Sequence, residues 1–403
     1  MKNNQGIDLV ILAGGTGSRI SKYTKKIPKP LIKINDIHFL QYLINFYSKF
    51  CFKKIYILAG YRGEKFKKFH NSYSNLIPIE TIVEKKKLDT GGAVYQLKKK
   101  IKNKFILING DSFINYDVKK FFISKLSDAE VGKILLVKKN NYKSNKKLSN
   151  LKVNTRGTIT TNGSLMNAGV YLFDKKIFNF LKLKKISLED NILPKLIDRK
   201  LIKGFCTNNQ ILDIGTYTNL KKAKKFLREN TNKYSVFFDR DGVINIDNKY
   251  VYKIKDFIFR KNVIPALKLL NKKNINIFIV TNQAGIARGF YSEKQFFQLS
   301  NYIKTLLDKK NIYINDLEFC PFHPDGKINK YRKTSSFRKP GNGMIKKIKK
   351  KWGLKNSNTY MLGDKASDSL AAKKSGIYFE YVEKDVLKQV KKINKKLIFS
   401  NYS

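Results

Sequence analysis

The chain has 403 residues and a formal net charge of +53, and it contains only three cysteines. Its length exceeds the usual size of a single hydrophobic core and predicts two domains of about 150 to 230 residues each. The basic residues are spread along the whole chain, so we expect a general compositional bias that favours phosphorylated substrates, with no specific nucleic acid as partner. The widely spaced cysteines exclude a disulfide framework and favour a reducing compartment.

The first apolar run, Leu9 to Ala13, is too short for a signal peptide core or a membrane span, so we expect a cytoplasmic protein that does not enter the membrane. Apolar runs of strand length then alternate with Lys-rich amphipathic stretches, which predicts an α/β fold built from βαβ units. The predicted strands are 9–12, 55–58, 105–108, 236–238, 278–280 and 360–362. A polar stretch at 228–233 ends a helical pattern, and we place the two domains at residues 1–230 and 234–395.

A glycine-rich turn follows the first predicted strand at once, with glycines at Gly14, Gly15 and Gly17. Such a turn lets backbone amides approach phosphates, although alone it is equally typical of a tight connection between a strand and a helix. Arg19 then closes the turn, and Lys29 follows between two prolines in a stiff segment that we expect to be extended. Two separated cations of this kind favour a nucleoside triphosphate as ligand.

Together with later motifs in the same order, these residues resemble the sugar-1-phosphate nucleotidyltransferases over about residues 7–225. The resemblance implies a Rossmann-like (GT-A-like) mixed sheet and Mg²⁺ held by Asp111 and Asp213. It implies nucleotide binding by the turn with Gly91 and Gly92, and sugar binding by Asn167, Gly169 and Glu189. The implied reaction is attack of a sugar-1-phosphate oxygen on the α-phosphorus of the triphosphate, with Arg19 and Lys29 as catalytic cations.

The first half departs from that family at two places. Asp89 stands where the family often has glycine, and the usual Glu-Lys pair is absent from residues 158–163. We therefore expect another lysine to help hold the sugar phosphate.

A second signature, Asp239-Arg240-Asp241-Gly242, follows an apolar strand in the second half. Alone, two aspartates in this spacing would be a solvated turn, but three further motifs follow it, and the set resembles the haloacid dehalogenase-type phosphatases. The resemblance implies a Rossmannoid domain without a large cap, with Asp239 as nucleophile and Asp241 as general acid and base. It also implies phosphate binding by Thr281, Asn282, Arg338 and Lys339, and Mg²⁺ binding by Asp239, Asp241 and Asp364, with Asp368 as the acidic partner of Asp364.

Flanking residues at 282–289, 320–326 and 337–340 resemble the heptose bisphosphate phosphatases and, more distantly, the histidinol-phosphate phosphatases. Members of this group usually carry a zinc ion in the loop before the Arg-Lys-Pro sequence. Here Cys320 is kept, but Phe322, Ser335 and Phe337 replace the other ligands. We therefore expect no zinc, with Phe322 and Phe337 ordering the loop by packing.

A phosphatase that removes the distal phosphate of a sugar bisphosphate would produce the sugar 1-phosphate that the first half consumes. We therefore expect heptose phosphates as substrates and GTP as the preferred donor among nucleoside triphosphates, because the first half most resembles the heptose-1-phosphate guanylyltransferases. Two alternatives stay open: a hexose-1-phosphate nucleotidyltransferase fused to a phosphatase of other specificity, and a basic nucleic-acid-binding protein with relic motifs. The sequence also leaves a homo-oligomer open.

Overall fold

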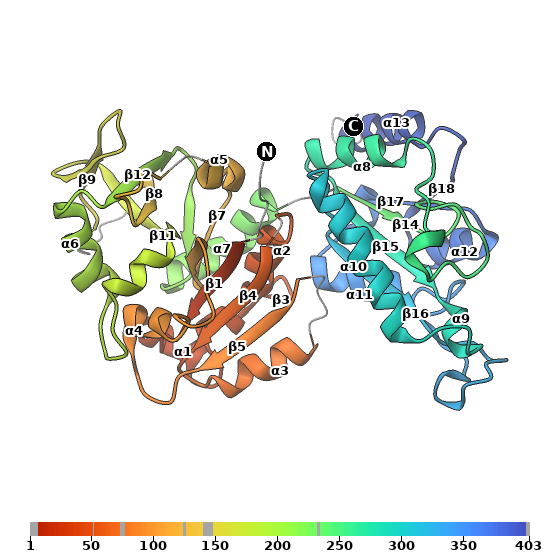
Figure 1. Cartoon of the computed structure of the whole chain (residues 1–403), viewed down its shortest axis with the longest axis horizontal. Helices are drawn as coiled ribbons and strands as arrows, with labels where there is room; N and C mark the ends of the chain where they lie inside the picture. Colours follow the sequence, from red (N-terminus) through yellow and green to blue (C-terminus); the bar gives the residue numbers. More distant parts are fainter. Residues whose placement is uncertain are drawn as a thin grey trace. The chain divides into compact units, whose positions relative to one another are not determined.

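The computed structural model describes residues 7–50, 52–72, 77–123, 126–139, 148–231 and 234–399. The chain divides into two compact units, Met1–Thr231 and Asn232–Ser403 (Figure 1). Residues 232 and 233 of the predicted domain junction lie outside the described part. Within the described residues, no helix has the length and apolar character needed to cross a membrane.

The first unit contains a mixed sheet of nine strands. Strands β5, β4, β1 and β6 are parallel, β11 runs antiparallel to β6, and β8 runs antiparallel to β11. The bounds in this sheet are β1 Ile7–Ala13, β4 Phe52–Ala59, β5 Ile79–Val83, β6 Phe105–Asn109, β8 Gly132–Lys138, β9 Leu151–Val153, β10 Ile159–Thr161, β11 Leu165–Phe173 and β12 Ile202–Thr207. Two small sheets pair β2 Lys33–Ile34 with β3 Ile37–His38, and β7 Ser112–Ile114 with β13 Ile211–Asp213.

Helices cover both faces of this sheet because alternate residues of each buried strand are apolar on both sides. In β1, Leu9 and Ile11 pack in one core cluster with helices α2, α3, α5 and α7, whereas Val10 packs in a second cluster with α4 and α6. The helices of this unit are α1 Ser21–Thr24, α2 Phe39–Tyr47, α3 Glu64–Ser72, α4 Asp89–Tyr95, α5 Val118–Ile123, α6 Leu193–Asp198 and α7 Tyr217–Asn230.

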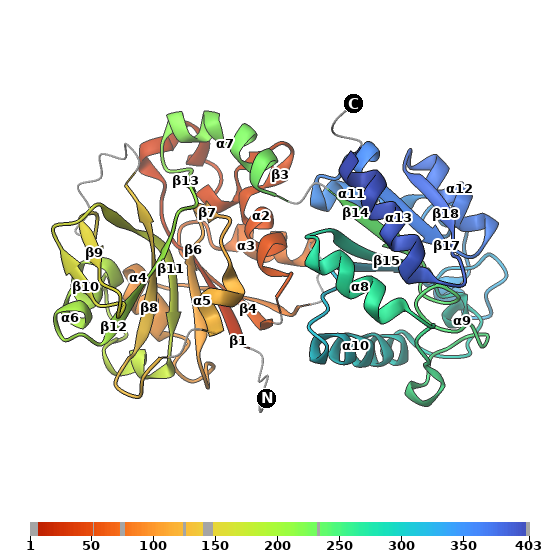
Figure 2. The ribbon, with the colours of Figure 1, turned by 90° about the horizontal axis from the view of Figure 1, so that it is seen from above.

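The second unit is a three-layer structure around a five-stranded parallel sheet with the strand order β16-β15-β14-β17-β18. Helices α8, α10 and α13 share one core cluster with the sheet, and α11 and α12 share the other. Figure 2 shows α8 and α13 side by side. The bounds are β14 Ser235–Phe238, α8 Val263–Lys272, β15 Asn276–Asn282, α9 Ala284–Ala287, α10 Glu293–Lys309, β16 Asp316–Cys320, α11 Gly343–Trp352, β17 Thr359–Gly363, α12 Ala366–Lys374, β18 Tyr378–Tyr381 and α13 Val386–Phe399.

The predicted α/β class with a mixed and a parallel sheet is confirmed, and all six predicted strands lie within observed strands. No separate cap domain is inserted in residues 234–399. In each unit the signature sequence begins where a central strand ends, after Ala13 of β1 and after Phe238 of β14. The carboxyl ends of parallel strands form the usual ligand-binding edge of such sheets.

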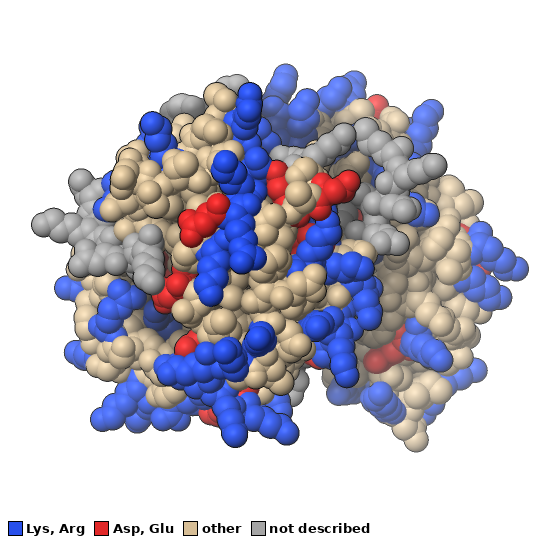
Figure 3. Space-filling model, turned by 60° about the vertical axis from the view of Figure 1, so that its left-hand side comes forward, with Lys and Arg blue, Asp and Glu red and all other residues tan. Residues whose placement is uncertain are grey.

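Basic side chains are distributed over the face seen in Figure 3, where Lys and Arg alternate with acidic and uncharged residues. This distribution agrees with the even spread of lysines along the sequence.

Candidate active sites

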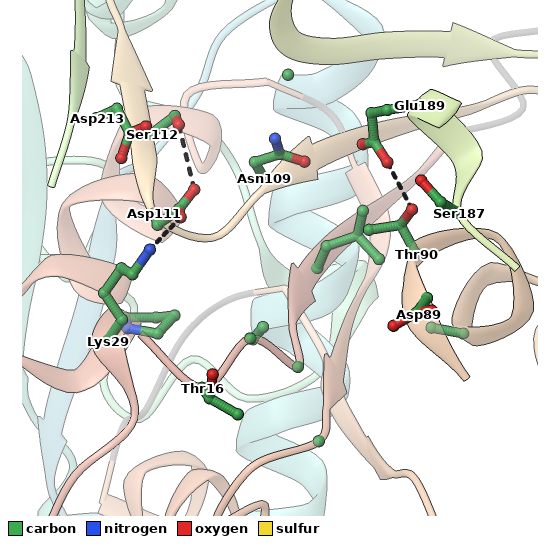
Figure 4. Close-up of a pocket in the computed structure, with 18 of the residues that line it drawn as sticks. Thr16, Lys29, Asp89, Thr90, Asn109, Asp111, Ser112, Ser187, Glu189 and Asp213 are labelled. Carbon is green, nitrogen blue, oxygen red and sulfur yellow. Dashed lines mark hydrogen bonds and ion pairs between the residues drawn. The ribbon is translucent and has the colours of Figure 1, made fainter. Parts of the chain in front are cut away.

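A cavity of about 1180 Å³ opens at the carboxyl ends of the central strands of the first unit. Figure 4 shows acidic, basic and amide side chains pointing into this cavity from several elements. Of the predicted site residues, the cavity is lined by Gly14, Gly15, Arg19, Lys29, Asp111, Asn167, Gly169, Glu189 and Asp213. The fold therefore gathers residues from Gly14 to Asp213, about half the chain apart, at one site.

One end of the cavity combines two carboxylates with two cations. The Nζ atom of Lys29 lies 2.7 Å from Oδ2 of Asp111, and the pairing of β13 with β7 brings Asp213 opposite Ser112, the neighbour of Asp111 (Figure 4). A β-carbon at Gly215 would lie 3.1 Å from Nη2 of Arg19 and 3.4 Å from Nζ of Lys29, so both cations converge there. Two acidic and two basic side chains in this arrangement fit a divalent cation and the phosphates that it would bridge.

The segment of Lys29 differs from its predicted extended form. Pro28 has extended backbone angles, but residues Lys29–Leu31 form a turn of 3₁₀-helix. The correction has a simple cause, because the φ angle fixed by proline suits the first turn of a helix as well as an extended chain. The turn buries Lys29, whose residue surface is 8% exposed, and directs its amine toward Asp111.

Three of the predicted nucleotide-binding glycines are not among the described residues that line the cavity: Gly17, Gly91 and Gly92. Gly17 has φ 68°, and a β-carbon there would lie 2.7 Å from the methyl group of Thr24. A β-carbon at Gly92 would lie 2.1 Å from the carbonyl oxygen of Lys184. These glycines therefore permit close contact between chain segments, and nucleotide contact by them stays a prediction.

Two acidic residues line another part of the cavity, and sequence reasoning overlooked one of them. Asp89 has φ 53°, the left-handed region in which glycine is unstrained, which explains why a glycine suits this position. Glu84 follows β5 directly, and a β-carbon at Gly14 would lie 3.2 Å from its Oε1 atom. Burial raises the pKa of Glu84, and the charge of Asp89 adds to this rise. The strand end before Glu84 was the signal that could have identified it.

The predicted sugar-binding residues Asn167 and Glu189 lie close together, since both are hydrogen-bonded to the hydroxyl of Tyr171. Asn167 and Gly169 belong to β11, and Glu189 follows at the start of a short π-helical turn, Leu188–Ile192. Gly169 has φ 70°, and a β-carbon there would lie 2.4 Å from Nδ2 of Asn109. Besides Lys29, the lysines that line the cavity are Lys85, Lys86 and Lys87, which are the described candidates for holding a sugar phosphate.

A buried group of three charged side chains forms the centre of the second unit. The Nζ atom of Lys339 lies 2.8 Å from Oδ2 of Asp239 and 2.6 Å from Oδ1 of Asp368, and it donates to the carbonyl oxygen of Val280 at 3.0 Å. Burial raises the pKa of Asp239 to about 6, the positive charge of Lys339 opposes this rise, and Asp368 adds to it. Burial alone would lower the pKa of Lys339, but the two carboxylates outweigh it and raise the pKa. Asp239 is therefore held by a fixed cation at the strand end.

This group includes a set of oxygens that fits a metal ion. Asp239, Asp364 and Asp368 each place a carboxylate oxygen within 4.8 Å of the others. The buried Oδ1 atom of Asp364 has no hydrogen-bond partner among the described residues, and a β-carbon at Gly242 would lie 2.3 Å from its Oδ2 atom. A buried oxygen without a donor, next to two further carboxylates, fits a hard cation such as Mg²⁺.

Asp241 lies beside this group, but its carboxylate contacts donors from other residues. Arg240 donates to it through Nη2 at 2.8 Å, Asn245 through Nδ2 at 3.0 Å and Gln283 through Nε2 at 3.0 Å. Its side chain is 17% exposed, against 9% for Asp239. The acidic set described above contains Asp368, the predicted acidic partner of Asp364, but not Asp241, whose metal-binding role stays a prediction. The tertiary contacts of Arg240 and Gln283 had no separate signal in the sequence.

Thr281 and Asn282 end β15 next to Lys339. The hydroxyl of Thr281 is buried and accepts a hydrogen bond from Nε2 of Gln283 at 2.7 Å. The amide of Asn282 donates to the carbonyl oxygen of Lys339 and accepts from its backbone N–H, both at 3.0 Å. Asn282 thus fixes the backbone of Lys339, a contact that its predicted phosphate-binding role did not include.

A second basic group surrounds Arg338. Nη2 of Arg288 lies 3.5 Å from Nε2 of His323, and Arg288 also contacts the hydroxyl of Tyr250. Among the described residues, neither Arg288 nor Arg338 forms an ion pair with a carboxylate, and the buried Nη1 atom of Arg338 has no partner. Burial lowers the pKa of Arg338, and the charge of Arg288 lowers it further. Adjacent guanidinium groups without a carboxylate partner fit an anionic ligand.

The loop in which the sequence predicts no zinc has an aromatic packing. The ring of Phe322 lies 6.2 Å from that of Tyr331, and Nζ of Lys333 lies 4.2 Å from the ring of Phe322. Phe337 packs against a core cluster that contains Cys320. Phenyl groups at two former ligand positions do not fit a tetrahedral zinc site.

Comparison with known proteins gave matches to each half of the chain. The family model described as nucleotidyl transferase matches residues 9–230, and the model described as polynucleotide kinase 3 phosphatase matches residues 235–397. A D-glycero-alpha-D-manno-heptose-1,7-bisphosphate 7-phosphatase of Photorhabdus laumondii is 42% identical over 147 residues, which are 36% of this chain and 80% of that protein.

Two further similar proteins were found. A D-glycero-beta-D-manno-heptose-1,7-bisphosphate 7-phosphatase of Haemophilus ducreyi is 41% identical over 146 residues, which are 36% of this chain and 80% of that protein. The crystal structure of HddC from Yersinia pseudotuberculosis is 28% identical, with a TM-score of 0.47, and covers 55% of this chain and 99% of that one.

Proposed function

We propose two successive reactions for this chain, which belongs to the nucleotidyl transferase family through residues 9–230 and to the family of the heptose-1,7-bisphosphate 7-phosphatases through its second unit. The chain is an enzyme with a nucleotidyltransferase part and a phosphatase part. In our proposal the second unit removes the 7-phosphate of D-glycero-D-manno-heptose 1,7-bisphosphate. The first unit then joins the resulting heptose 1-phosphate to a nucleotidyl group.

The observation that carries this proposal is a pair of neighbouring basic groups in the second unit. Lys339, paired with Asp239, would hold the phosphate that reacts, and the preceding residue, Arg338, lies with Arg288 and His323 in the second basic group. A sugar monophosphate would leave the second group without an anion, whereas a bisphosphate offers one phosphate to each. This arrangement supports a bisphosphate substrate.

The proposed phosphatase reaction uses the two aspartates in turn. A carboxylate oxygen of Asp239 attacks phosphorus, the bond from phosphorus to the sugar oxygen breaks, and Asp241 gives its proton to that oxygen. Water then attacks the aspartyl-phosphate while Asp241 takes the proton, which releases inorganic phosphate and restores Asp239. Asp239, Asp364 and Asp368 would hold Mg²⁺, which when bound reduces the repulsion between the carboxylate and the phosphate.

The proposed nucleotidyl transfer needs no protein nucleophile. A phosphate oxygen of heptose 1-phosphate attacks the α-phosphorus of the triphosphate, and pyrophosphate leaves on the opposite side. Arg19 and Lys29 would stabilise the charge on the leaving phosphates, and Asp111 and Asp213 would hold Mg²⁺ there. GTP is the donor that we propose first, on the sequence resemblance to guanylyltransferases.

The test is mass spectrometry of one reaction mixture with the full chain, Mg²⁺, and each of the four ribonucleoside triphosphates in turn. Because the relatives act on different anomers by name, the α and β anomers of heptose 1,7-bisphosphate are supplied separately. GDP-heptose is the expected product, with one inorganic phosphate released per sugar.

Other products would distinguish the remaining readings. Heptose 1-phosphate as the only product would contradict the proposed donor or sugar of the first unit. No consumption of either bisphosphate, with turnover of mannose or glucose 1-phosphate, would favour the hexose alternative. Salt-sensitive binding of nucleic acid without turnover of any sugar would favour the reading with relic motifs.

A further inference from the structure

Backbone hydrogen bonds join the turn at the start of α4 to the segment before Glu189. The N–H of Ile186 donates to the carbonyl oxygen of Leu88 at 3.0 Å, and the N–H of Gly91 donates to that of Ile186 at 2.9 Å. A β-carbon at Gly91 would lie 3.0 Å from the same oxygen of Ile186. The glycines of this turn therefore allow the two segments to lie against each other.

The side chain of Thr90 extends this connection to the cavity. Its hydroxyl donates to Oε2 of Glu189 at 2.6 Å and accepts from the N–H of Leu188 at 2.7 Å. Figure 4 shows Thr90 and Glu189 facing each other, with Asp89 beside them. One hydroxyl thus fixes the carboxylate of Glu189 relative to the turn of Asp89 and Thr90.

A second hydroxyl holds the other oxygen of the same carboxylate. Tyr171 is fully buried, and its hydroxyl donates to Oε1 of Glu189 at 3.2 Å while it accepts from Nδ2 of Asn167 at 2.7 Å. Oδ1 of Asn167 accepts from the N–H of Gly169 at 2.8 Å. A continuous chain of hydrogen bonds therefore runs from Thr90 through Glu189 and Tyr171 to Asn167 on β11.

We propose that Thr90 and Tyr171 are positioning residues through which the triphosphate and the sugar phosphate strengthen each other's binding. This inference rests on the proposed function, and on the roles that the sequence resemblance implies, with the turn of Thr90 facing the nucleotide and Glu189 and Asn167 facing the sugar. A nucleotide that orders the turn would also order Glu189, so the sugar phosphate would bind to a carboxylate that is already held in place. Coupling of this kind is reciprocal, because both ligands stabilise the same arrangement.

The experiment measures binding of heptose 1-phosphate to the full chain by calorimetry, with and without the unreactive α,β-methylene analogue of GTP. In the unaltered protein we expect the analogue to raise the affinity for the sugar phosphate by about tenfold, within the usual range of coupling. Thr90→Val and Tyr171→Phe should each reduce this ratio to about twofold or less. Affinity for the analogue alone should stay the same in Tyr171→Phe, and Thr90→Ser, which keeps the hydroxyl, should keep the coupling.

Tyr42→Phe is a matched control for Tyr171→Phe. It removes another buried hydroxyl of the first unit, one that donates to the carbonyl oxygen of Ile34 at 3.1 Å, and should leave the coupling unchanged. Full coupling in both Thr90→Val and Tyr171→Phe would overturn the inference. It would also be overturned if Tyr171→Phe lost as much affinity for the analogue alone as for the sugar phosphate, or if the analogue did not change the affinity of the unaltered protein for the sugar phosphate. No binding of heptose 1-phosphate under any condition would instead contradict the proposed function.

Discussion

The two candidate sites solve different steric problems. The first is a cavity of about 1180 Å³ whose walls come from many elements, with space for a nucleotide and a sugar at once. The second is a compact group in which the amine of Lys339 lies within 3 Å of a carboxylate oxygen of both Asp239 and Asp368, and each residue as a whole is at most 6% exposed. The difference follows the proposed chemistry, because a transfer between two large substrates needs positioning, whereas a covalent step needs one nucleophile held against its cation.

The two sites also differ in how their charged side chains are arranged. In the first unit, cations and carboxylates are spread over the cavity wall, and Lys29 pairs with Asp111 at 2.7 Å. In the second, burial raises the pKa of Asp239, and the two carboxylates raise the pKa of Lys339 against the effect of burial. Substitutions in the second site should therefore lower the rate of the chemical step directly. Substitutions in the first site should change substrate binding as well as the rate.

The largest expected effect is that of Asp239→Asn. The amide cannot attack phosphorus, so release of phosphate from heptose 1,7-bisphosphate should fall by at least about a thousandfold. Nucleotidyl transfer to heptose 1-phosphate supplied directly should keep its rate, because Asp239 belongs to the other unit. Phosphate release and pyrophosphate release, measured on one preparation, check both statements. Loss of both activities in a folded variant would contradict two independent sites.

Asp111→Asn should have the reverse effect, and a smaller one. The change removes a charge that pairs with Lys29, and nucleotidyl transfer should fall roughly a hundredfold as electrostatic stabilisation is lost. Release of phosphate should be unaffected. The measurement is initial rate against Mg²⁺ concentration, since a lost metal ligand should also raise the concentration needed for half-maximal rate. An unchanged Mg²⁺ dependence would argue against Asp111 as a ligand.

The pH dependence of the phosphatase should reflect the raised pKa of Asp239. Burial raises the pKa of Asp239 to about 6, and a protonated carboxyl cannot act as nucleophile. Phosphatase activity should therefore fall by about tenfold per pH unit below about pH 6. A bound cation favours the ionised carboxylate, so this limb should move to lower pH as Mg²⁺ is raised. Rates from pH 4.5 to 8 at two Mg²⁺ concentrations check the prediction. If the fall in activity at low pH did not shift with Mg²⁺ concentration, a group other than Asp239 would be responsible for it.

The smallest expected effect concerns Asp89. Its left-handed backbone costs free energy for any residue with a β-carbon, so Asp89→Gly should raise the free energy of unfolding by about 0.5 kcal/mol. Asp89→Ala removes the same carboxylate but keeps the β-carbon, and should bring no such gain. Chemical denaturation of both variants makes the comparison. Equal stability of the two would mean that the carboxylate, rather than the backbone, determines the effect.

Sequence alone predicted what depends on local pattern. The strands of both units follow from apolar runs, and the positions of Asp111, Asp213 and Asp239 follow from their place at strand ends. The sequence could not predict what depends on tertiary contact. Glycine permits close approach of a ligand and of another chain segment equally well, so Gly91 and Gly92 gave no sign that they pack against residues 184–188.

The same limit explains the residues that sequence reasoning left out or described only in part. Arg288 joins Arg338 from a different loop. Asn282 was identified, but its contact with the backbone of Lys339 spans 57 positions in the chain. Such contacts follow from how the sheet and its loops fold together, which one sequence does not specify.

The connection between the two units is short, since α7 ends at Asn230 and β14 begins at Ser235. Both active sites are thus translated from one message in a fixed ratio of one to one. If the proposed function holds, the cell cannot adjust the amounts of the two activities separately, and the balance between bisphosphate, monophosphate and nucleotide sugar must follow from the turnover rates of the two sites alone. A mutation that slows one unit would therefore shift the steady-state level of its own substrate, with no compensating change in expression available to restore it.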